Sequence, residues 1–146
     1  MKLYKIGLVI VALALLNSCS KDDDPSNTYA KPNWTLASAN QLPNSLTAIV
    51  SIPSNLNIYG TDEDMAAAFI DDECRGIGSL VVNESSDKRV FYLTIRGSSI
   101  ENQKITFRYY NARLSYLYQA TNIVYFDSDA NYGTYDEPVE LDLFQQ

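Results

Sequence analysis

The 146-residue chain contains no histidine. Histidine is the usual general base at neutral pH and the commonest protein ligand for zinc and copper. Its absence excludes Ser-His-Asp and Cys-His catalysis. A glycosidase-like pair of carboxylates needs no histidine, but among the 18 acidic residues no pair stands out by its sequence context. We therefore predict that the protein is not an enzyme.

The chain also lacks an apolar run long enough to span a bilayer. Residues 6–16 are apolar and follow two lysines, but a transmembrane helix needs roughly 20 such residues. The run ends in Leu-Asn-Ser-Cys at residues 16–19, where a small residue precedes the cysteine. This pattern is typical of a bacterial lipobox. We predict that residues 1–18 are a signal peptide and that the new N-terminal Cys19 carries diacylglycerol and further acyl chains such as palmitate.

Cysteine is scarce, because the chain has only Cys19 and Cys74. Once Cys19 carries lipid, Cys74 has no partner within the chain, and the fold must stand without an intrachain disulfide. We expect Cys74 to be a small buried apolar side chain, since free cysteine is among the most often buried residue types. A reactive thiol is the alternative.

Basic residues are outnumbered, with 11 lysines and arginines against 18 acidic residues. Removing residues 1–18 takes away Lys2 and Lys5 and changes the formal net charge from −7 to −9. A chain of this charge does not attract nucleic acid or anionic lipid. Attachment to a membrane must therefore come from the acyl chains on Cys19.

Residues 19–33 are polar, contain two prolines and carry too little apolar surface to fold alone. We predict a flexible tether over this range. Its Lys21-Asp22-Asp23-Asp24 run, close after the lipidated cysteine, resembles the acidic export signal of Bacteroides-type lipoproteins. That resemblance implies a position on the outer face of the outer membrane. The alternative is a solvated charge run that keeps the tether extended.

Residues 34–146 alternate apolar and polar side chains, as in Leu46, Ala48 and Val50 with Thr47 and Ser51 between them. Turn-forming residues separate about eight such runs, which are residues 46–52, 65–70, 77–82, 89–95, 104–110, 114–118, 123–126 and 139–144. No stretch shows a convincing helical period. The spacing predicts one all-β domain, an antiparallel β-sandwich or barrel.

Residues 67–78 join two strands through a tight acidic turn, and they carry the pattern Ala-Phe followed by Glu-Cys-Arg-Gly. This hairpin resembles that of a recurrent module of secreted and surface proteins in the same bacterial group. The resemblance continues in residues 91–95, 105–110 and 133–143. It implies an Ig-like or jelly-roll-like sandwich without catalytic activity, usually an accessory domain of adhesive or glycan-related proteins. We expect this copy to stand alone on its anchor.

The role of the hairpin turn has two interpretations. Arg75 either pairs with Glu73, or with a carboxylate on a neighbouring strand, and fixes the turn. Alternatively, Asp71, Asp72 and Glu73 bind a cation or a basic group of a partner.

Residues 127–133 place oxygen donors at alternate positions, which is the spacing of a calcium-binding loop. An EF-hand is excluded, because Tyr132 stands where that loop needs glycine and Pro138 where it needs glutamate. A different structural calcium site formed by Asp127, Asp129 and Asn131 is one hypothesis. A plain polar turn is the other, and we expect no further cofactor.

Eleven tyrosines and one tryptophan are many for this length. Aromatic rings on an exposed sheet face form platforms on which sugars or protein partners stack. Alternation places Tyr109 and Tyr110 on opposite faces, and it turns Tyr116 and Tyr118 outward if Leu117 is in the core. The candidate ligand-binding residues are Trp34, Tyr92, Tyr110 and Tyr118.

These observations lead to one functional hypothesis with one alternative. We predict a non-catalytic lipoprotein, anchored in the outer membrane and facing outward, that binds a glycan or a protein partner at the cell surface. The alternative is a structural subunit of a surface or envelope assembly, whose strand edges pair with another chain.

Overall fold

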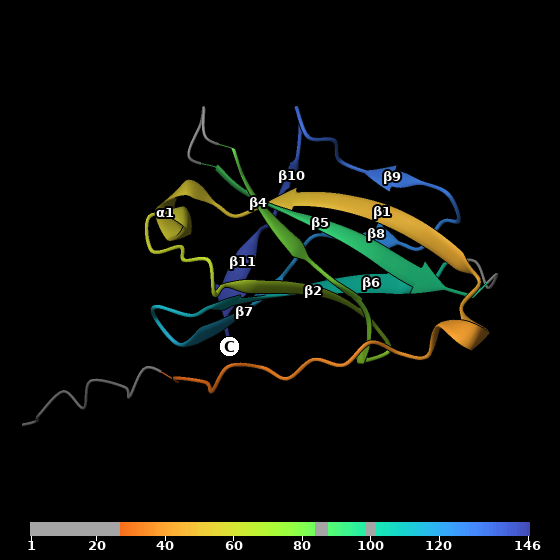
Figure 1. The fold of residues 1–146 in the computed structure, drawn as a ribbon, viewed down its shortest axis with the longest axis horizontal. Coiled ribbons are helices and arrows are strands. Elements are labelled where there is room, and N and C mark those ends of the chain that lie inside the picture. The colour runs from red at the N-terminus through yellow and green to blue at the C-terminus, as the bar shows by residue number, and fades with distance from the viewer. Residues whose placement is uncertain (1–26, 84–87, 99–101) are drawn as a thin grey trace, which may run out of the picture.

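The computed structural model describes residues 27–83, 88–98 and 102–146, and these residues form two β-sheets packed face to face (Figure 1). Cys19, the lipobox and the acidic run at residues 21–24 lie outside the described residues. Within the described part of the chain, no helix is both long and apolar enough to cross a membrane. The all-β sandwich predicted from the strand spacing is confirmed.

Sheet A has the strand order β10-β1-β5-β4, and β9 also pairs with β1. Its strands are β1 (Asn44–Ser51), β4 (Ser79–Asn83), β5 (Lys88–Gly97), β9 (Asn131–Tyr132) and β10 (Val139–Glu140). Both β9 and β10 run parallel to β1, whereas β5 runs antiparallel to it.

Sheet B has the order β11-β7-β6-β2-β3, and β8 also pairs with β6. Its strands are β2 (Met65–Ile70), β3 (Glu73–Ile77), β6 (Lys104–Asn111), β7 (Tyr116–Ala120), β8 (Val124–Tyr125) and β11 (Leu143–Gln145). The two short helices are η1 (Ala39–Gln41) and α1 (Ser54–Asn57).

The described residues contain eleven strands rather than about eight, because two predicted runs each cross from one sheet to the other. At Gly78 the chain leaves β3 in sheet B and enters β4 in sheet A. A Cβ on Gly78 would lie 3.1 Å from the Phe91 ring, so a larger residue would require the ring to shift by a few tenths of an ångström. At the fully buried Leu141 the chain passes from β10 to β11 in the same way. Strand β9 was not predicted.

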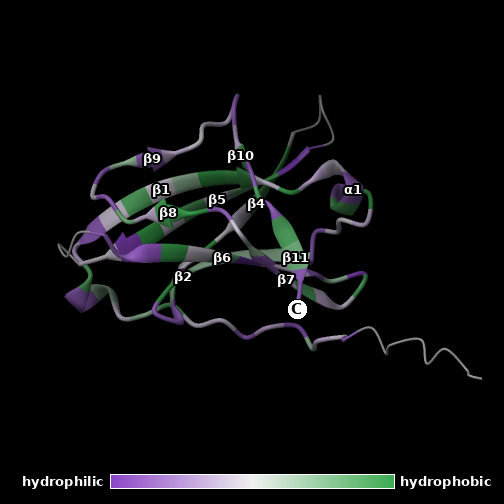
Figure 2. Cartoon of the chain, turned by 180° about the vertical axis from the view of Figure 1, so that it is seen from behind, coloured by the Kyte–Doolittle hydropathy of each residue, from purple (hydrophilic) through white to green (hydrophobic). Residues whose placement is uncertain are grey.

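The core lies between the sheets and follows the predicted alternation. Leu46, Ala48 and Val50 of β1 are buried, and so are Phe91, Leu93 and Ile95 of β5. Strand β6 contributes Ile105, Phe107 and Tyr109 from the facing sheet. Figure 2 shows polar and apolar bands along β6, and a continuous apolar stretch toward the end of β1. Burying one face of each sheet removes apolar surface from water, which is the main force that holds such layers together.

A buried carboxylate holds one end of the sandwich together. Asp64, just before β2, is 6% exposed and accepts hydrogen bonds from the Thr61 N–H (3.1 Å) and hydroxyl (3.0 Å), the Tyr109 hydroxyl (2.6 Å) and the Ala112 N–H (2.9 Å). The Asn111 amide donates to the Tyr109 oxygen at 3.0 Å. Burial, and then the adjacent Asp64 carboxylate, raise the pKa of Tyr109 well above its usual range. The phenol therefore stays protonated and donates to Asp64.

Residues 27–42 form an N-terminal strap that is extended as far as Ser38, ends in η1 and runs along the outer face of sheet B (Figure 1). The Tyr29 N–H donates to the Ser115 carbonyl at 2.7 Å, and the Ala37 N–H donates to the Cys74 carbonyl at 2.9 Å. The strap thus spans from the β6–β7 turn to β3. It includes residues 27–33, the end of the predicted tether, where the Tyr29 N–H is bonded to the β6–β7 turn although the segment has little apolar patterning.

Trp34 packs the strap against sheet B, and its removal should loosen the strap. The Trp34 and Phe69 rings meet edge to face with centroids 5.7 Å apart. We expect Trp34→Ala to lower the free energy of unfolding by about 2 kcal/mol, roughly half the loss for a fully buried tryptophan. Leu36→Ala is the matched control, because Leu36 lies on the same segment with 53% of its surface exposed. Equal urea midpoints for the two variants would contradict this assignment.

Candidate functional site

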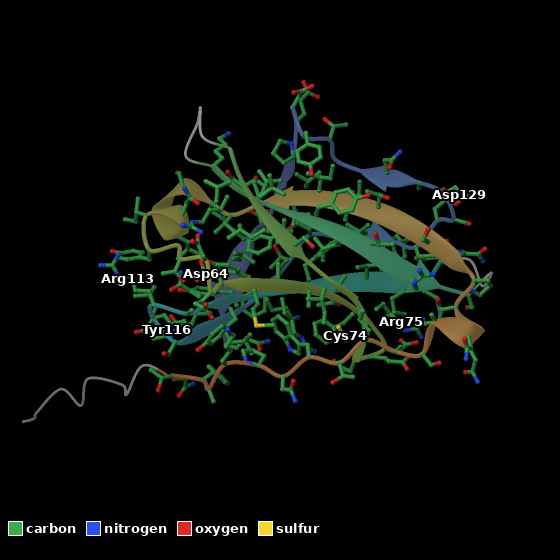
Figure 3. The ribbon with its side chains drawn as sticks, in the orientation of Figure 1. Asp64, Cys74, Arg75, Arg113, Tyr116 and Asp129 are labelled. Carbon is green, nitrogen blue, oxygen red and sulfur yellow. The ribbon has the colours of Figure 1, made fainter. Side chains whose placement is uncertain are left out.

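Part of the outer face of sheet B is apolar and lies beneath the strap. Ala67, Phe69 and Cys74 form a second buried cluster there, with Trp34 and Ile77 packed against it. Figure 3 shows Cys74 on the side of sheet B that faces the strap. Burial raises the pKa of the Cys74 thiol, so the neutral form is favoured. Cys74 is thus a buried apolar residue, as expected, and its environment does not favour a reactive thiolate.

Two of the four predicted ligand-binding aromatics, Tyr110 and Tyr118, are buried and do not belong to an exposed aromatic surface. Tyr118 is 6% exposed and belongs to the core, where it packs against Tyr109 with ring centroids 5.9 Å apart. Leu117 is the residue that faces outward on β7, the reverse of the orientation assumed. Tyr110 lies on the outer face, as alternation allowed, but it is 4% exposed and its hydroxyl donates to the Tyr29 carbonyl of the strap at 3.3 Å.

The third, Trp34, lies on the strap with its edge against Phe69 and is half-buried. It therefore anchors the strap to sheet B. The structure does not bring Trp34, Tyr92, Tyr110 and Tyr118 together on one surface, because Tyr92 belongs to the other sheet.

Tyr92 lies on the outer face of sheet A and stacks on Tyr135, which was not among the predicted ligand-binding residues. Its ring is nearly parallel to that of Tyr135, with an interplanar angle of 15° and centroids 6.4 Å apart. Tyr92 is half-buried, opposite Ile49 of β1 and Ser79 of β4 in the strand register. Tyr135 is 53% exposed. We call this pair the tyrosine surface.

The loop between β9 and β10 holds Tyr135 over sheet A. Gly133 has φ +82°, and a Cβ there would lie 2.4 Å from the Ile49 carbonyl oxygen, so this position requires glycine. The Thr134 N–H donates to the Glu137 carbonyl, and the Glu137 N–H donates to the Thr134 hydroxyl, both at 3.0 Å. The positive φ and the two hydrogen bonds fix the loop, so Tyr135 is presented from an ordered turn.

The predicted calcium loop is an exposed connection between β8 and β9. Asp129 has φ +61°, and its N–H donates to the Ser45 carbonyl at 2.8 Å. Asn131 begins β9 and pairs with Thr47. Asp127 and Asp129 are exposed, and nowhere in the described ranges do three His, Cys, Asp or Glu side chains converge as metal ligands would. The geometry of these residues is that of a polar turn that leads the chain into β9.

Two acidic residues at the turn of the β2–β3 hairpin form ion pairs with arginines of β3 and β6. Asp71 and Asp72 both have positive φ, which is typical of a two-residue hairpin turn. Asp72 pairs with Arg108 at 2.5 Å, and Glu73 pairs with Arg75 at 2.7 Å. These pairs correspond to the interpretation in which arginines fix the turn. Asp72 and Glu73 are exposed, so each pair contributes only about 0–1 kcal/mol to stability.

No family model, curated protein or solved structure matches this chain.

Proposed function

We propose that this protein is a non-catalytic lipoprotein, anchored in the outer membrane through acylated Cys19 and facing outward, that binds a glycan through the tyrosine surface. The observation that carries the binding proposal is the ordered, exposed stacking of Tyr135 on Tyr92. Parallel aromatic rings on a sheet face provide the flat apolar area on which a sugar ring stacks. The lipobox and the acidic run after it support the anchor and its outward display.

The charge around the tyrosine surface favours a neutral glycan. Asp136 and Glu137 are exposed on the same loop as Tyr135, and the mature chain carries a formal net charge of −9 if residues 1–18 are removed. A uronic or phosphorylated glycan would approach like charges, which lowers affinity and on-rate. Neutral polysaccharides of the cell surface or the surroundings are therefore the class we propose.

Tyr135→Ala is expected to weaken glycan binding about tenfold, which corresponds to the roughly 1.4 kcal/mol that one stacked aromatic anchor contributes. Tyr125→Ala is the matched control, because Tyr125 is also 53% exposed but lies on β8. The measurement is binding of the purified full-length protein to a glycan array and to insoluble cell-wall polysaccharides. Binding of the original protein to none of these glycans, or equal losses for the two variants, would overturn the proposal.

The alternative, a subunit of a surface assembly, is supported by the edge of sheet A. Strand β4 is the last strand on that side, and Val81 and Val82 are 36% and 44% exposed. An edge strand offers unpaired backbone groups to a strand from another chain. Co-purification of a stoichiometric partner from detergent extracts would favour this function, and a purely monomeric extract would count against it.

A further inference from the structure

A polar pocket of about 270 Å³ lies where the end of the strap meets β3 and the end of β5. Its lining residues are Ala37, Ser38, Gln41, Leu42, Glu73, Arg75 and Ser98. Figure 3 shows Arg75 near the η1 turn, at the end of the sandwich opposite Asp64. The pocket shares no residue with the tyrosine surface, so it can be tested independently of the proposed function.

Arg75 is fixed in this pocket with hydrogen-bonding capacity left over. Its side chain is only 10% exposed. Nε and Nη2 donate to the Glu73 Oε2 atom at 2.9 and 2.7 Å, and Nη1 donates to the Arg96 carbonyl at 3.5 Å. A guanidinium group has five N–H donors in a planar fork, so two have no partner among the residues that the structure describes. Both contacts to Glu73 end on Oε2, so within the described ranges its Oε1 atom is open as an acceptor.

The charges of Arg75 and Glu73 cancel, which selects against charged ligands. An anion would bring its charge next to the Glu73 carboxylate, and a cation would meet the Arg75 guanidinium. A neutral ligand is repelled by neither charge. If it carries several hydroxyl groups, it can accept from Arg75 and donate to Glu73, because each hydroxyl both donates and accepts. The Ser38 and Ser98 hydroxyls and the Gln41 amide add groups of both kinds. Ala37 and Leu42 supply apolar surface for carbon atoms.

We propose that this pocket binds one neutral sugar residue, with the free N–H groups of Arg75 and the free carboxylate oxygen of Glu73 on neighbouring hydroxyls. The volume lies just below the roughly 300–1,000 Å³ of sites for drug-sized ligands, which suits a single ring. The Arg75 side chain is buried and is held by hydrogen bonds to Glu73 and Arg96, so its donors are positioned before a ligand binds. The Glu-Cys-Arg-Gly hairpin thus supplies both charged groups of the pocket, since Glu73 and Arg75 project from the same strand.

The experiment titrates ¹⁵N-labelled full-length protein in detergent with the methyl glycosides of glucose, galactose, mannose and N-acetylglucosamine, and separately with glucuronate. We expect saturable shifts of the Ser38, Gln41 and Ser98 amide signals and of the Arg75 Nε–H signal with at least one methyl glycoside. Arg75→Lys keeps the charge but loses the planar fork, so binding should weaken about tenfold or more. Arg113→Lys, on an exposed arginine outside the pocket, should leave it unchanged.

A second variant keeps the test valid if Arg75→Lys fails to fold. Glu73→Gln changes a half-exposed side chain and gives the pocket a net positive charge, so glucuronate binding should increase while methyl glycoside binding weakens. Three outcomes would overturn the proposal: no saturable shift with any of the four methyl glycosides, tighter binding of glucuronate than of all four to the original protein, or shifts only at Tyr92 and Tyr135. The third would leave the function proposed for the tyrosine surface intact.

Discussion

Replacing Asp64 with asparagine is expected to lower the free energy of unfolding by about 3 kcal/mol, because buried donors lose their acceptor. Each carboxylate oxygen of Asp64 accepts from one backbone N–H, Oδ2 from Thr61 and Oδ1 from Ala112. An asparagine in either orientation places its NH₂ group against one of these N–H groups. A hydroxyl can rotate to become an acceptor, but a backbone N–H cannot. The variant keeps the volume of Asp64, so the loss measures hydrogen bonding rather than a cavity.

Urea denaturation of Asp64→Asn and Asp62→Asn gives the comparison. The Asp62 side chain is 89% exposed and lies 3.4 Å from Arg89, so its replacement should change stability by about 0.5 kcal/mol or less. Tyr109→Phe should fall between the two, because it removes one of the four donors to Asp64 and the oxygen that accepts from Asn111. Coinciding unfolding curves for Asp64→Asn and Asp62→Asn would refute the role assigned to this carboxylate.

Cys19→Ala is expected to abolish lipid attachment completely and to leave an unprocessed precursor. Signal peptidase acts on the lipidated cysteine in the lipobox, and the thiol is the only group in the motif that can take the diacylglycerol. If Cys19 carries acyl chains as proposed, their loss also removes the membrane attachment that they provide to a negatively charged chain. The measurement is metabolic labelling with an alkyne-tagged palmitate, followed by gel mobility and membrane fractionation.

Cys74→Ala is the matched control for this prediction, because it removes the other cysteine, which is buried beneath the strap. That variant should keep the lipid label and the mature mobility. Persistent labelling of Cys19→Ala, or its cleavage to mature size, would be incompatible with the lipobox interpretation.

The fold class could be predicted from the sequence because each long strand buries one face. The alternation in β1, β5 and β6 predicts which side chains enter the core, and those side chains are buried between the sheets in the structure. The crossings at Gly78 and Leu141 could not be predicted, because the apolar pattern continues through both residues. Whether a strand stays in its sheet there depends on contacts with distant residues, such as Phe91 against Gly78.

The candidate site was only partly predictable, because alternation groups residues by face without saying which face meets water. Tyr118 was placed on the wrong face for this reason. Tyr110 was on the expected face, but the strap covers it, and the strap is held by backbone hydrogen bonds that leave no apolar pattern in the sequence. Tyr135 was missed because its partner, Tyr92, is 43 positions away. The glycine two residues before it was the one local sign of an ordered loop.

Asp64 was missed for a related reason. In the sequence it is one of three acidic residues in Thr-Asp-Glu-Asp, at positions 61–64, which is typical of an exposed turn. Its four donors come from Thr61 and from β6 and the turn after it, so burial becomes evident only when β2 and β6 are paired. The pairing of Glu73 with Arg75, in contrast, was one of the two interpretations of the hairpin, because the two residues lie on the same side of one strand.

The most direct test of the binding proposal is to observe the tyrosine rings during glycan binding. Protein with ¹³C-labelled tyrosine rings is titrated with oligosaccharides released from bacterial cell-surface polysaccharide, and the ring signals are followed by two-dimensional NMR. We expect the Tyr92 and Tyr135 signals to shift together and to saturate, while the equally exposed Tyr125 signal stays in place. Saturable shifts of Tyr125 without Tyr92 and Tyr135, or no shift of any tyrosine ring, would contradict the account.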